Sequence, residues 1–498
     1  MIQRRQFLRT SLLSGAYVQM MAGIGSWALP FARAAGANQD IRLGVIGVGS
    51  TVKIGGMGKK QIRAFRQIPG VRVVAICDPD RAHLDAEAEQ FKKWNAPLET
   101  YTDLRKMLDN KNIDAVVITT PNHWHALATI WACQAGKDVF VQKPACHNIF
   151  EGRKMIEASR KYNRVVHCPS MSRSPNGIKE ALDYMRQGNL GKPLYVHGIN
   201  YKPRTSIGKV SGQQPVPSSL DYNLWSGPAP VLPVMREYLH YDWHWMWQYG
   251  NGDLGNMGIH ALDGCRMAVN HDSLPPRVLS IGGRFGYTDD GQTPNTQIMW
   301  FDYQPVPIVF EVRGLPKNKS FLKSAWDRNV KTTMDSHFDI QVGLTVHCEQ
   351  GYIANNKAFD SGGKLIKEFK PTIPEPESDF IAAVQQRKTS GCLCDIPHGH
   401  WSAALIHMCN ASYRLGKSSL AGETRERIQG NKQLQLVFER FQEHLLANDI
   451  DLVKEPSTLG PVLTMNPNTE HFVGDFSNEA NPLITREYRA PFVVPEKV

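Results

Sequence analysis

Glycines early in the chain have the spacing of a turn that binds a pyrophosphate. Gly47 and Gly49 follow a short apolar run, and Gly56 and Gly58 stand just before a helical pattern. When residues 50–55 are treated as an insertion, these glycines match the Gly-x-Gly-x-x-Gly fingerprint. One glycine then makes the tight turn, one lets the backbone approach the phosphates, and one lets the following helix pack closely. The spacing therefore predicts a dinucleotide-binding turn.

An acidic residue stands where the ribose of such a dinucleotide would lie. Asp78 comes 20 residues after Gly58, at the end of the next apolar run. A carboxylate at this place accepts hydrogen bonds from the adenosine ribose and repels a 2′-phosphate. The predicted cofactor is therefore NAD, with NADP less favoured.

These residues need a parallel sheet to bring them together, and the surrounding pattern predicts one. Continuous apolar runs predict buried strands at residues 41–46, 71–77, 114–119 and 138–141. Helical patterns alternate with them near residues 61–65, 82–94, 102–108 and 124–134. This alternation predicts an α/β fold with an N-terminal Rossmann domain, a doubly wound parallel sheet.

The second half of the chain has a different pattern. Residues 194–201 predict a strand, and alternating segments between residues 277 and 352 predict a largely antiparallel sheet. Helices are expected at residues 378–387, 400–415 and 434–446. The predicted boundaries are a signal peptide at 1–34, a Rossmann domain at 35–168, a substrate-binding α/β domain at 169–430, and a C-terminal helix and extended tail at 431–498.

The N-terminus predicts export through the twin-arginine pathway. Arg4 and Arg5 precede a moderately apolar run at residues 12–31, and Ala32-Arg33-Ala34 forms an Ala-x-Ala cleavage site. We therefore expect a periplasmic or secreted protein that is exported folded. An uncleaved membrane anchor is the alternative, because about 20 apolar residues are enough to span a bilayer.

Composition argues against nucleic-acid binding. The formal net charge is +10, and removal of the predicted leader would leave +6, without any long basic run.

The nine cysteines are an odd number and stand mostly in apolar stretches, which predicts buried thiols. No strong metal-ligand spacing is present: His240, His244 and His260 with Asp242 match no known pattern, and we predict no metal.

Several motifs, in this order, resemble the Gfo/Idh/MocA oxidoreductase family. The motifs are Thr-Pro-Asn-His-Trp-His at 120–125, Gln-Lys-Pro at 142–144, residues 255–263, and the ending at 483–489. The ending is similar to that of secreted, twin-arginine members, the glucose-fructose oxidoreductase-like subgroup. Two positions depart from the family pattern: Gln142 replaces a glutamate, and Asn256 replaces an acid of the substrate motif.

The resemblance implies nicotinamide chemistry on a sugar or polyol, with an open C-terminal sheet that serves oligomerisation. Lys143 and His260 would flank the substrate carbon, where a base must take the hydroxyl proton as hydride leaves. Asn256, four residues before His260, would share its helical face and position a hydroxyl. More of the proton transfer would then fall on His260 and Lys143.

The remaining site predictions concern cofactor and substrate contacts. Asn122 and His125 are expected on the nicotinamide side, with helix capping as the alternative role for Asn122. The predicted cofactor-binding residues are Gly47, Gly49, Gly56, Gly58, Asp78, Thr120, Pro121, Asn122, His125, Gln142 and Lys143. The predicted substrate-binding residues are Tyr201, His244, Trp245 and Asp263, of which Asp263 would orient His260 or pair locally.

Three functions are compatible with these residues. The first is a periplasmic oxidoreductase whose tightly bound nicotinamide cofactor transfers hydride at a hydroxyl carbon of a sugar, polyol or glycoside. The second is a glycoside-cleaving enzyme that oxidises its substrate transiently, eliminates the aglycone and reduces the product again. The third is a non-catalytic sugar-binding protein. A homo-oligomer, a dimer or tetramer, is expected in each case.

Overall fold

The computed structural model describes residues 40–49, 55–322 and 333–498. The predicted export signal and most of the insertion at residues 50–55 lie outside these ranges. Among the helices of the described ranges, none has the length and apolar character needed to cross a membrane.

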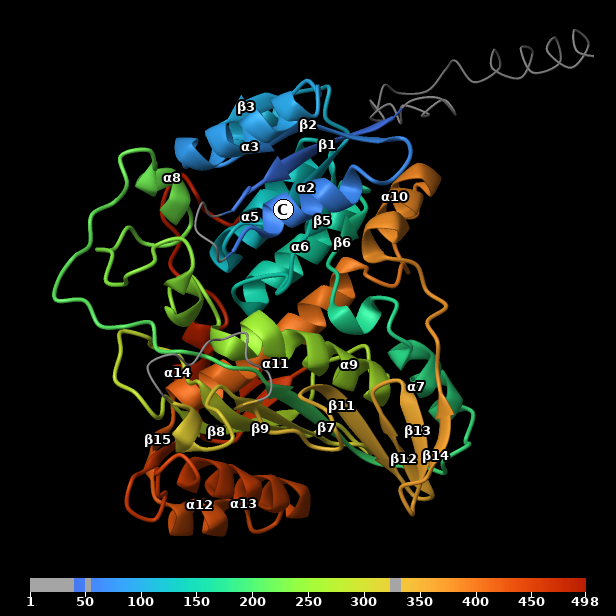
Figure 1. The fold of residues 1–498 in the computed structure, drawn as a ribbon, viewed down its shortest axis with the longest axis vertical. Helices are drawn as coiled ribbons and strands as arrows, with labels where there is room; N and C mark the ends of the chain where they lie inside the picture. Colours follow the sequence, from blue (N-terminus) through green and yellow to red (C-terminus); the bar gives the residue numbers. More distant parts are fainter. Residues whose placement is uncertain (1–39, 50–54, 323–332) are drawn as a thin grey trace, which may run out of the picture. The chain divides into compact units, whose positions relative to one another are not determined.

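Within the described ranges, the N-terminal sheet has six strands in the order β3-β2-β1-β4-β5-β6 (Figure 1). Every neighbouring pair is parallel. This order confirms the predicted Rossmann domain and places its switch point between β1 and β4. The strands are β1 (Ile41–Ile46), β2 (Val71–Cys77), β3 (Glu99–Tyr101), β4 (Ala115–Ile118), β5 (Asp138–Val141) and β6 (Val166–His167).

Helices cover both faces of this sheet, and side-chain caps fix where several of them begin. Asp80 accepts a hydrogen bond from the Ala82 N–H at the start of α3, and Asn148 accepts one from Glu151 at the start of α6. Such caps satisfy backbone donors that have no partner within the helix. The helices are α2 (Met57–Phe65), α3 (Arg81–Lys93), α4 (Leu104–Leu108), α5 (Asn122–Gln134) and α6 (Ile149–Lys161).

The C-terminal sheet contains twelve strands within the described ranges, in the main order β14-β13-β12-β11-β7-β10-β9-β8-β16-β15. The β7–β10 pair is parallel, and the other pairs are antiparallel, as predicted. The strands are β7 (Pro193–Tyr201), β8 (Arg277–Gly283), β9 (Thr296–Phe301), β10 (Ile308–Arg313), β11 (Val342–Cys348), β12 (Gly351–Ala354), β13 (Lys357–Asp360), β14 (Leu365–Glu368), β15 (Lys417–Ser419), β16 (Ser457–Leu459), β17 (Leu463–Asn466) and β18 (His471–Val473).

Helices pack on this sheet in two groups (Figure 1). The helices α7, α9 and α11 share the main apolar cluster with the face of the sheet that is nearer the Rossmann domain. The helices α12 and α13 pack below β8, β9 and β10, on the opposite face. Their bounds are α7 (Ile178–Arg186), α9 (Ile259–Val269), α11 (Ile396–Arg414), α12 (Ala421–Ile428) and α13 (Lys432–Leu446). The remaining helices are α8 (Tyr222–Ser226), α10 (Pro376–Gln386) and α14 (Ser477–Ala480).

The last residues of the chain join both parts of the fold. The strands β16 and β17 pair with β8 in the C-terminal sheet. Further on, Phe492 and Val494 are buried in an apolar cluster of the Rossmann domain. The segment after residue 431 is therefore integrated into the fold, although the domain boundaries themselves stay predictions.

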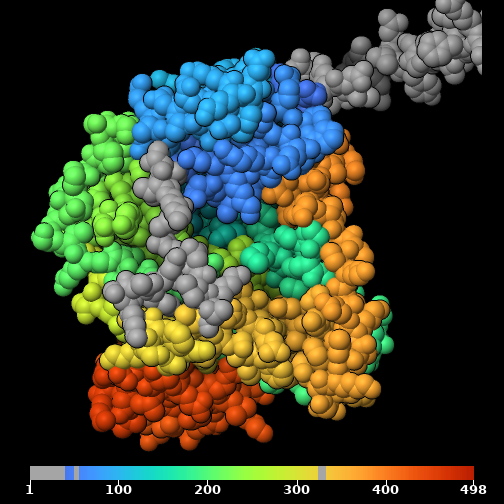
Figure 2. Space-filling model, in the orientation of Figure 1, coloured from blue at the N-terminus to red at the C-terminus, as the bar shows by residue number. Residues whose placement is uncertain are grey.

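A long segment with little regular structure, residues 202–250, packs against the Rossmann domain, and we call it the clasp. Beside α3, the Arg81 N–H donates to the Ser219 carbonyl at 3.0 Å, and the Asp221 N–H donates to the Pro79 carbonyl at 3.0 Å. The Trp124 indole donates to the Trp225 carbonyl at 3.0 Å. On the face drawn in Figure 2, the green clasp borders the blue Rossmann residues.

The nine cysteines are all buried and free. This confirms the prediction of buried thiols.

Candidate active site

A pocket lies where the carboxyl ends of β1, β2, β4 and β5 meet the clasp. This is the switch point of the parallel sheet, where such folds bind their ligands. Twelve of the predicted site residues line the pocket: Gly47, Gly49, Gly56, Asp78, Thr120, Pro121, Asn122, His125, Gln142, Lys143, His244 and Asn256.

The backbone of the glycine turn faces the pocket closely enough to contact a pyrophosphate. No side chain larger than hydrogen fits at Gly47, Gly49 or Gly58. Gly47 and Gly49 have φ angles of 85° and 96°, a region that disfavours other residues. A Cβ on Gly49 would lie 2.4 Å from the Gly56 Cα, and one on Gly58 would lie 2.1 Å from the Gly47 carbonyl oxygen. Gly58 thus packs α2 onto the turn, while the other three glycines face the pocket. These features fit a bound dinucleotide.

Asp78 ties the end of β2 to this turn. Its Oδ2 atom accepts the Val48 N–H at 3.0 Å, and its Oδ1 atom accepts the Asp80 N–H at 3.0 Å. Both bonds hold the carboxylate at the edge of the pocket, where the sequence predicts the adenosine ribose. Oδ2 keeps a second lone pair for a ribose hydroxyl, while the Nδ1 atom of His83 lies 3.4 Å from Oδ1.

Asn122 and His125 occupy the other side of the switch point. Asn122 is the first residue of α5 and makes no capping bond; its amide donates to the Asn251 side chain at 3.0 Å. The His125 ring lies between two carbonyl oxygens, 2.7 Å from Pro144 and 2.8 Å from Thr120. Burial lowers the pKa of His125 to about 4, so the neutral ring donates to one of them at a time. His125 therefore braces the ends of β4 and β5.

Lys143 is the titratable group best placed for proton transfer. Its Nζ atom donates to the backbone carbonyl of Asn256. Burial and the positive charge of Arg204 together lower the pKa of Lys143 to about 8, while Asp253 opposes the shift. Arg204 and Asp253 form a buried ion pair, with the Arg204 Nε atom 2.7 Å from the carboxylate. An appreciable fraction of the amine is neutral at neutral pH and is able to accept a proton.

His260 does not line the dinucleotide pocket, and one of its ring nitrogens is already hydrogen-bonded to the backbone. Its Nδ1 atom accepts the backbone N–H of Met171 at 3.0 Å. The neutral ring must then carry its proton on Nε2, and a cationic ring would lose this bond. Burial and the nearby charge of Lys143 hold the pKa of His260 well below its usual value. The Nε2 atom of the neutral ring is therefore a hydrogen-bond donor.

Asp263 positions His260 indirectly. The Arg173 Nε atom lies 2.8 Å from the Asp263 carboxylate, and Ser170 and Ser402 also donate to it. Burial would raise the pKa of Asp263, but Arg173 and Arg266 outweigh burial and hold it well below its usual value. These bonds fix the turn that supplies the Met171 N–H to His260. Asp263 does not line the dinucleotide pocket, so its predicted substrate contact is not found there.

Asn256 enters the pocket through an irregular turn. It lies in the π-helix η3 (Leu254–Gly258), directly before α9. The expected α-helical face shared by Asn256 and His260 is therefore interrupted between them. In this turn, the backbone carbonyl of Asn256 accepts the hydrogen bond from the Lys143 Nζ atom. Single π turns of this kind often occur at functional sites.

Two predicted substrate residues lie elsewhere. Tyr201 is 1 % exposed, donates to Glu311 Oε2 at 2.8 Å, and accepts a bond from Arg440 on α13. Side chains alternate along a strand, so the preceding residue, Asn200, turns to the opposite face and donates to Asp253 at 3.0 Å. Trp245 packs over the Arg204 guanidinium at 5.3 Å and does not line the pocket.

The sequence did not reveal the contribution of the clasp. His244, which was predicted, lines the pocket and stacks on Trp243 at 3.7 Å between ring centroids. The clasp residues that were not predicted are Leu224, Trp225, His240, Tyr241 and Trp243. The only sequence signal for them was the density of aromatic residues, which is more often a sign of core packing. His83 also lines the pocket from α3 and was not predicted.

The parallel sheet, the glycine turn and the pocket define an oxidoreductase with an NAD-binding domain. The family model described as "Oxidoreductase family, NAD-binding Rossmann fold" matches residues 41–169, and that described as "Oxidoreductase family, C-terminal alpha/beta domain" matches residues 176–333. The chain therefore belongs to the Gfo/Idh/MocA family of oxidoreductases. Membership favours an enzyme over the non-catalytic alternative.

Curated relatives cover part of the chain. "Glycosyl hydrolase family 109 protein 1" of Shewanella sp. (strain ANA-3) is 27 % identical over 281 residues, which is 48 % of this chain and 60 % of the relative. "Alpha-N-acetylgalactosaminidase" of Shewanella oneidensis shows the same identity and coverage. The chain thus spans well under two thirds of the length of these relatives.

Solved structures share the fold at low identity. The WlbA dehydrogenase of Bordetella pertussis, in complex with NADH and UDP-GlcNAcA, is 18 % identical with a TM-score of 0.53, over 76 % of this chain and 97 % of that one. The aldose-aldose oxidoreductase of Caulobacter crescentus is 17 % identical with a TM-score of 0.51, over 74 % and 96 % of the two chains.

Proposed function

We propose that the protein is an oxidoreductase that transfers hydride at a hydroxyl carbon of a sugar, polyol or glycoside and holds its NAD tightly. The observation that carries this proposal is the position of Lys143, whose pKa is lowered to about 8 at the carboxyl end of β5. When bound, the nicotinamide supplies the hydride acceptor or donor. Lys143 takes the hydroxyl proton, and His260 donates its Nε2 proton as a hydrogen bond to the same oxygen.

NAD is favoured over NADP by charge. Asp78 is buried at the end of β2, and its carboxylate lies at the edge of the pocket. A 2′-phosphate beside this carboxylate would meet repulsion, whereas ribose hydroxyls would find an acceptor. Mass spectrometry of the dinucleotide released on denaturation would identify it, and NADP as the main species would contradict this assignment.

The clasp provides a physical reason for tight retention. It lines the pocket and is fixed to the Rossmann domain beside α3 and at Trp124. Release of a dinucleotide would require these contacts to open. Retention suits a protein exported into a compartment without a nicotinamide pool, because each turnover must then close its redox cycle on the same cofactor. Protein purified from the periplasm should therefore release stoichiometric NAD(H) on denaturation, and an empty preparation would argue against the proposal.

Glycoside cleavage is a second candidate, favoured by the names of the curated relatives. Oxidation of a ring hydroxyl acidifies the neighbouring C–H bond, elimination expels the aglycone, and reduction after addition of water restores the cofactor. No second redox substrate is then needed. Lys143 would serve the oxidation step in both candidates, so the pocket alone does not separate them.

An isotope experiment separates the two candidates. The enzyme is incubated in deuterated water with a panel of aryl glycosides, including an N-acetyl-α-galactosaminide. Ring deuterium together with released aglycone, and no net NADH, supports cleavage. Net formation of a ketone or lactone without aglycone release supports the dehydrogenase. The Lys143→Met variant serves as the control and should lose either activity.

Export and assembly complete the proposal. We propose that residues 1–34 direct folded export to the periplasm. A Lys-Lys replacement of Arg4 and Arg5 should hold the protein in the cytoplasm with its cofactor bound.

We also propose a homo-oligomer, supported by exposed apolar side chains on the edge strand β14, Leu365 and Ile366, each 46 % exposed. Light scattering that gives a monomer mass at micromolar concentration would contradict it.

A further inference from the structure

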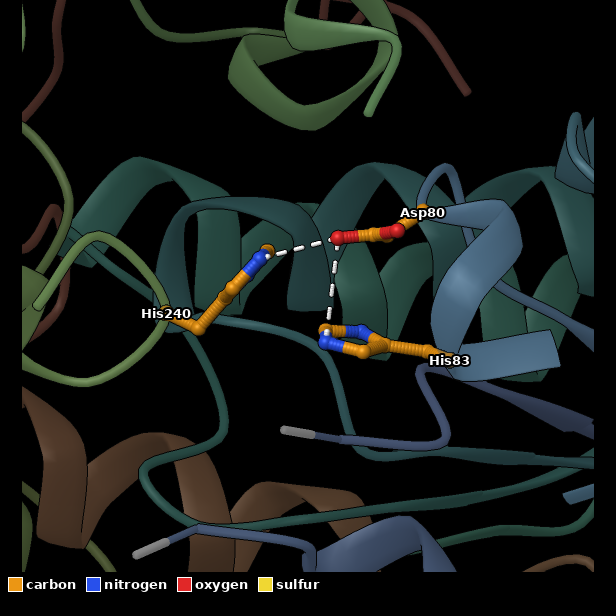
Figure 3. A group of neighbouring side chains, drawn as sticks. All are labelled: Asp80, His83 and His240. Atoms are coloured by element: carbon orange, nitrogen blue, oxygen red, sulfur yellow. Dashed lines mark hydrogen bonds and ion pairs between the residues drawn. The ribbon is translucent and has the colours of Figure 1, made fainter. Parts of the chain in front are cut away.

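Two histidines and an aspartate from distant parts of the chain meet at the edge of the dinucleotide pocket (Figure 3). Asp80 and His83 belong to the first turn of α3, and His240 belongs to the clasp. One ligand atom from each residue lies within 4.8 Å of the other two. His83 and His240 also line the pocket.

The carboxylate of Asp80 divides its two oxygens between separate tasks. Oδ1 accepts the Ala82 N–H at 3.0 Å as the cap of α3. Oδ2 faces both imidazoles, 3.0 Å from the Nε2 atom of His240 and 3.7 Å from the Nε2 atom of His83 (Figure 3). The helix cap therefore fixes the carboxylate and leaves one oxygen directed at the two rings.

The orientation of His83 is that of a metal ligand with a supporting carboxylate. Its Nδ1 atom lies 3.4 Å from Asp78 Oδ1, and Asp78 is held in turn by the N–H groups of Val48 and Asp80. Ligating histidines usually present their second nitrogen to such a group, which fixes the tautomer and the ring. With Nδ1 turned to Asp78, the Nε2 atom of His83 faces His240 and Asp80.

Hydrogen bonding alone does not account for the whole arrangement. His240 and Asp80 are at hydrogen-bond distance, but 3.7 Å between His83 Nε2 and Asp80 Oδ2 exceeds it. Two ligands on one tetrahedral ion, each about 2.1 Å away, lie about 3.4 Å apart. The two Asp80 contacts, 3.0 and 3.7 Å, bracket this separation, and all three ligand atoms lie within 4.8 Å of one another, so an ion would draw them closer together.

We propose that Asp80, His83 and His240 bind a divalent transition metal of the zinc class. Two imidazoles and one carboxylate suit Zn²⁺, whereas Mg²⁺ and Ca²⁺ prefer oxygen ligands. The ion fastens the clasp to the Rossmann domain at the adenosine end of the pocket, and its fourth position faces the pocket. Local sequence spacing does not predict this site, because Asp80 and His83 stand about 160 residues before His240. The proposal does not depend on the reaction proposed above.

The test uses the full chain, stripped of metal with a chelator and titrated with Co²⁺. We expect about one Co²⁺ to bind per chain. The bound ion should show the visible d–d absorption bands of a Co²⁺ site with nitrogen and oxygen ligands. His83→Gln and His240→Gln should each weaken binding at least about tenfold. His271→Gln is the matched control, since His271 contacts a carbonyl of the C-terminal domain and should leave binding unchanged.

Folding of the variants is checked separately, because His83 is buried. His240 is 19 % exposed and lies on the clasp, so His240→Gln keeps the Rossmann core intact. Zn²⁺ should also slow proteolysis of the clasp in the wild type and not in His240→Gln. Binding by the wild type that is no tighter than binding by a variant carrying both His83→Gln and His240→Gln would overturn the proposal, as would full Co²⁺ affinity in folded His240→Gln.

Discussion

The amine of Lys143 titrates in the physiological range, because burial and Arg204 lower its pKa to about 8. A base must be neutral to accept a proton, so substrate oxidation should rise about tenfold per pH unit below this value and level off above it. The measurement is kcat against pH for the best substrate of the panel. Lys143→Arg, which stays charged, should lose at least about 100-fold in kcat and still retain the dinucleotide. A rate independent of pH between 6 and 9 would contradict this assignment.

His260 is predicted to act as a donor and not as the base. The Met171 N–H occupies its Nδ1 atom, so the proton stays on Nε2. His260→Gln, which keeps an N–H donor, should lower kcat about tenfold and leave the pH profile in place, whereas His260→Ala should lose more. If the limb near pH 8 disappears in His260→Gln, the base is His260 and this interpretation is wrong.

Among single residues, the sequence correctly predicted those pocket residues that stand shortly after the end of a parallel strand. Asp78, Asn122 and Gln142 line the pocket because parallel strands end at one edge of the sheet. Tyr201 does not line the pocket; successive strand residues face opposite sides of the sheet, and no local pattern shows that Tyr201 faces Glu311 and Arg440. The tautomer of His260 depends on a backbone N–H 89 residues away, which no local pattern shows.

The α2 helix depends on a glycine at its first turn. A Cβ at position 58 would lie 2.1 Å from the Gly47 carbonyl oxygen and 2.7 Å from the Val48 Cα. Gly58→Ala should therefore destabilise the fold by about 1–3 kcal/mol and release the dinucleotide. Gly422→Ala is the control, because a Cβ there meets nothing within 4 Å. Urea denaturation of both variants tests this, and equal stability of the two would contradict it.

Strands buried on both faces were the most predictable elements. The runs at 41–46, 71–77 and 138–141 coincide with β1, β2 and β5, because continuous apolar residues have no other stable place. The strands β13 and β14 were not predicted: β14 is exposed along its length, so it lacks the apolar signal. The π turn η3 lies where Asn256 and His260 were expected to share one α-helical face, and the residue spacing alone does not distinguish the two kinds of turn.

Across the whole molecule, the C-terminal tail holds the clasp from outside. The Arg489 Nη2 atom donates to the carbonyls of Asn223 and Gly227, each at 2.9 Å. Arg489→Ala should loosen the clasp and speed dinucleotide loss about tenfold, measured by fluorescence after dilution. Arg425→Ala removes an exposed ion pair with Glu439 and should leave the release rate unchanged. Equal release rates for the two variants would show that the tail does not secure the clasp.

The tail also covers a carboxyl group that resists ionisation. Glu151 is fully buried and accepts a bond from Tyr488, and burial raises its pKa to about 7. Folding then favours the protonated acid, so its contribution to stability is greatest at low pH and falls as pH rises from about 4 to 7. Glu151→Gln, which cannot ionise, should lose up to about 3 kcal/mol less in the free energy of unfolding than the wild type between pH 4 and pH 8. Denaturation of both proteins at both pH values tests this, and an equal pH dependence of the two would contradict it.

The clasp also sets an order of events during synthesis. Residues 202–250 emerge from the ribosome after the six strands of the parallel sheet and before Phe492 and Val494, which pack on the Rossmann domain. Under the proposed export route, cofactor that binds before the clasp docks would be enclosed by it. Protein refolded in the absence of NAD should therefore bind NAD slowly when NAD is added afterwards. Occupancy would then depend on whether NAD was present during folding, more than on the NAD concentration afterwards.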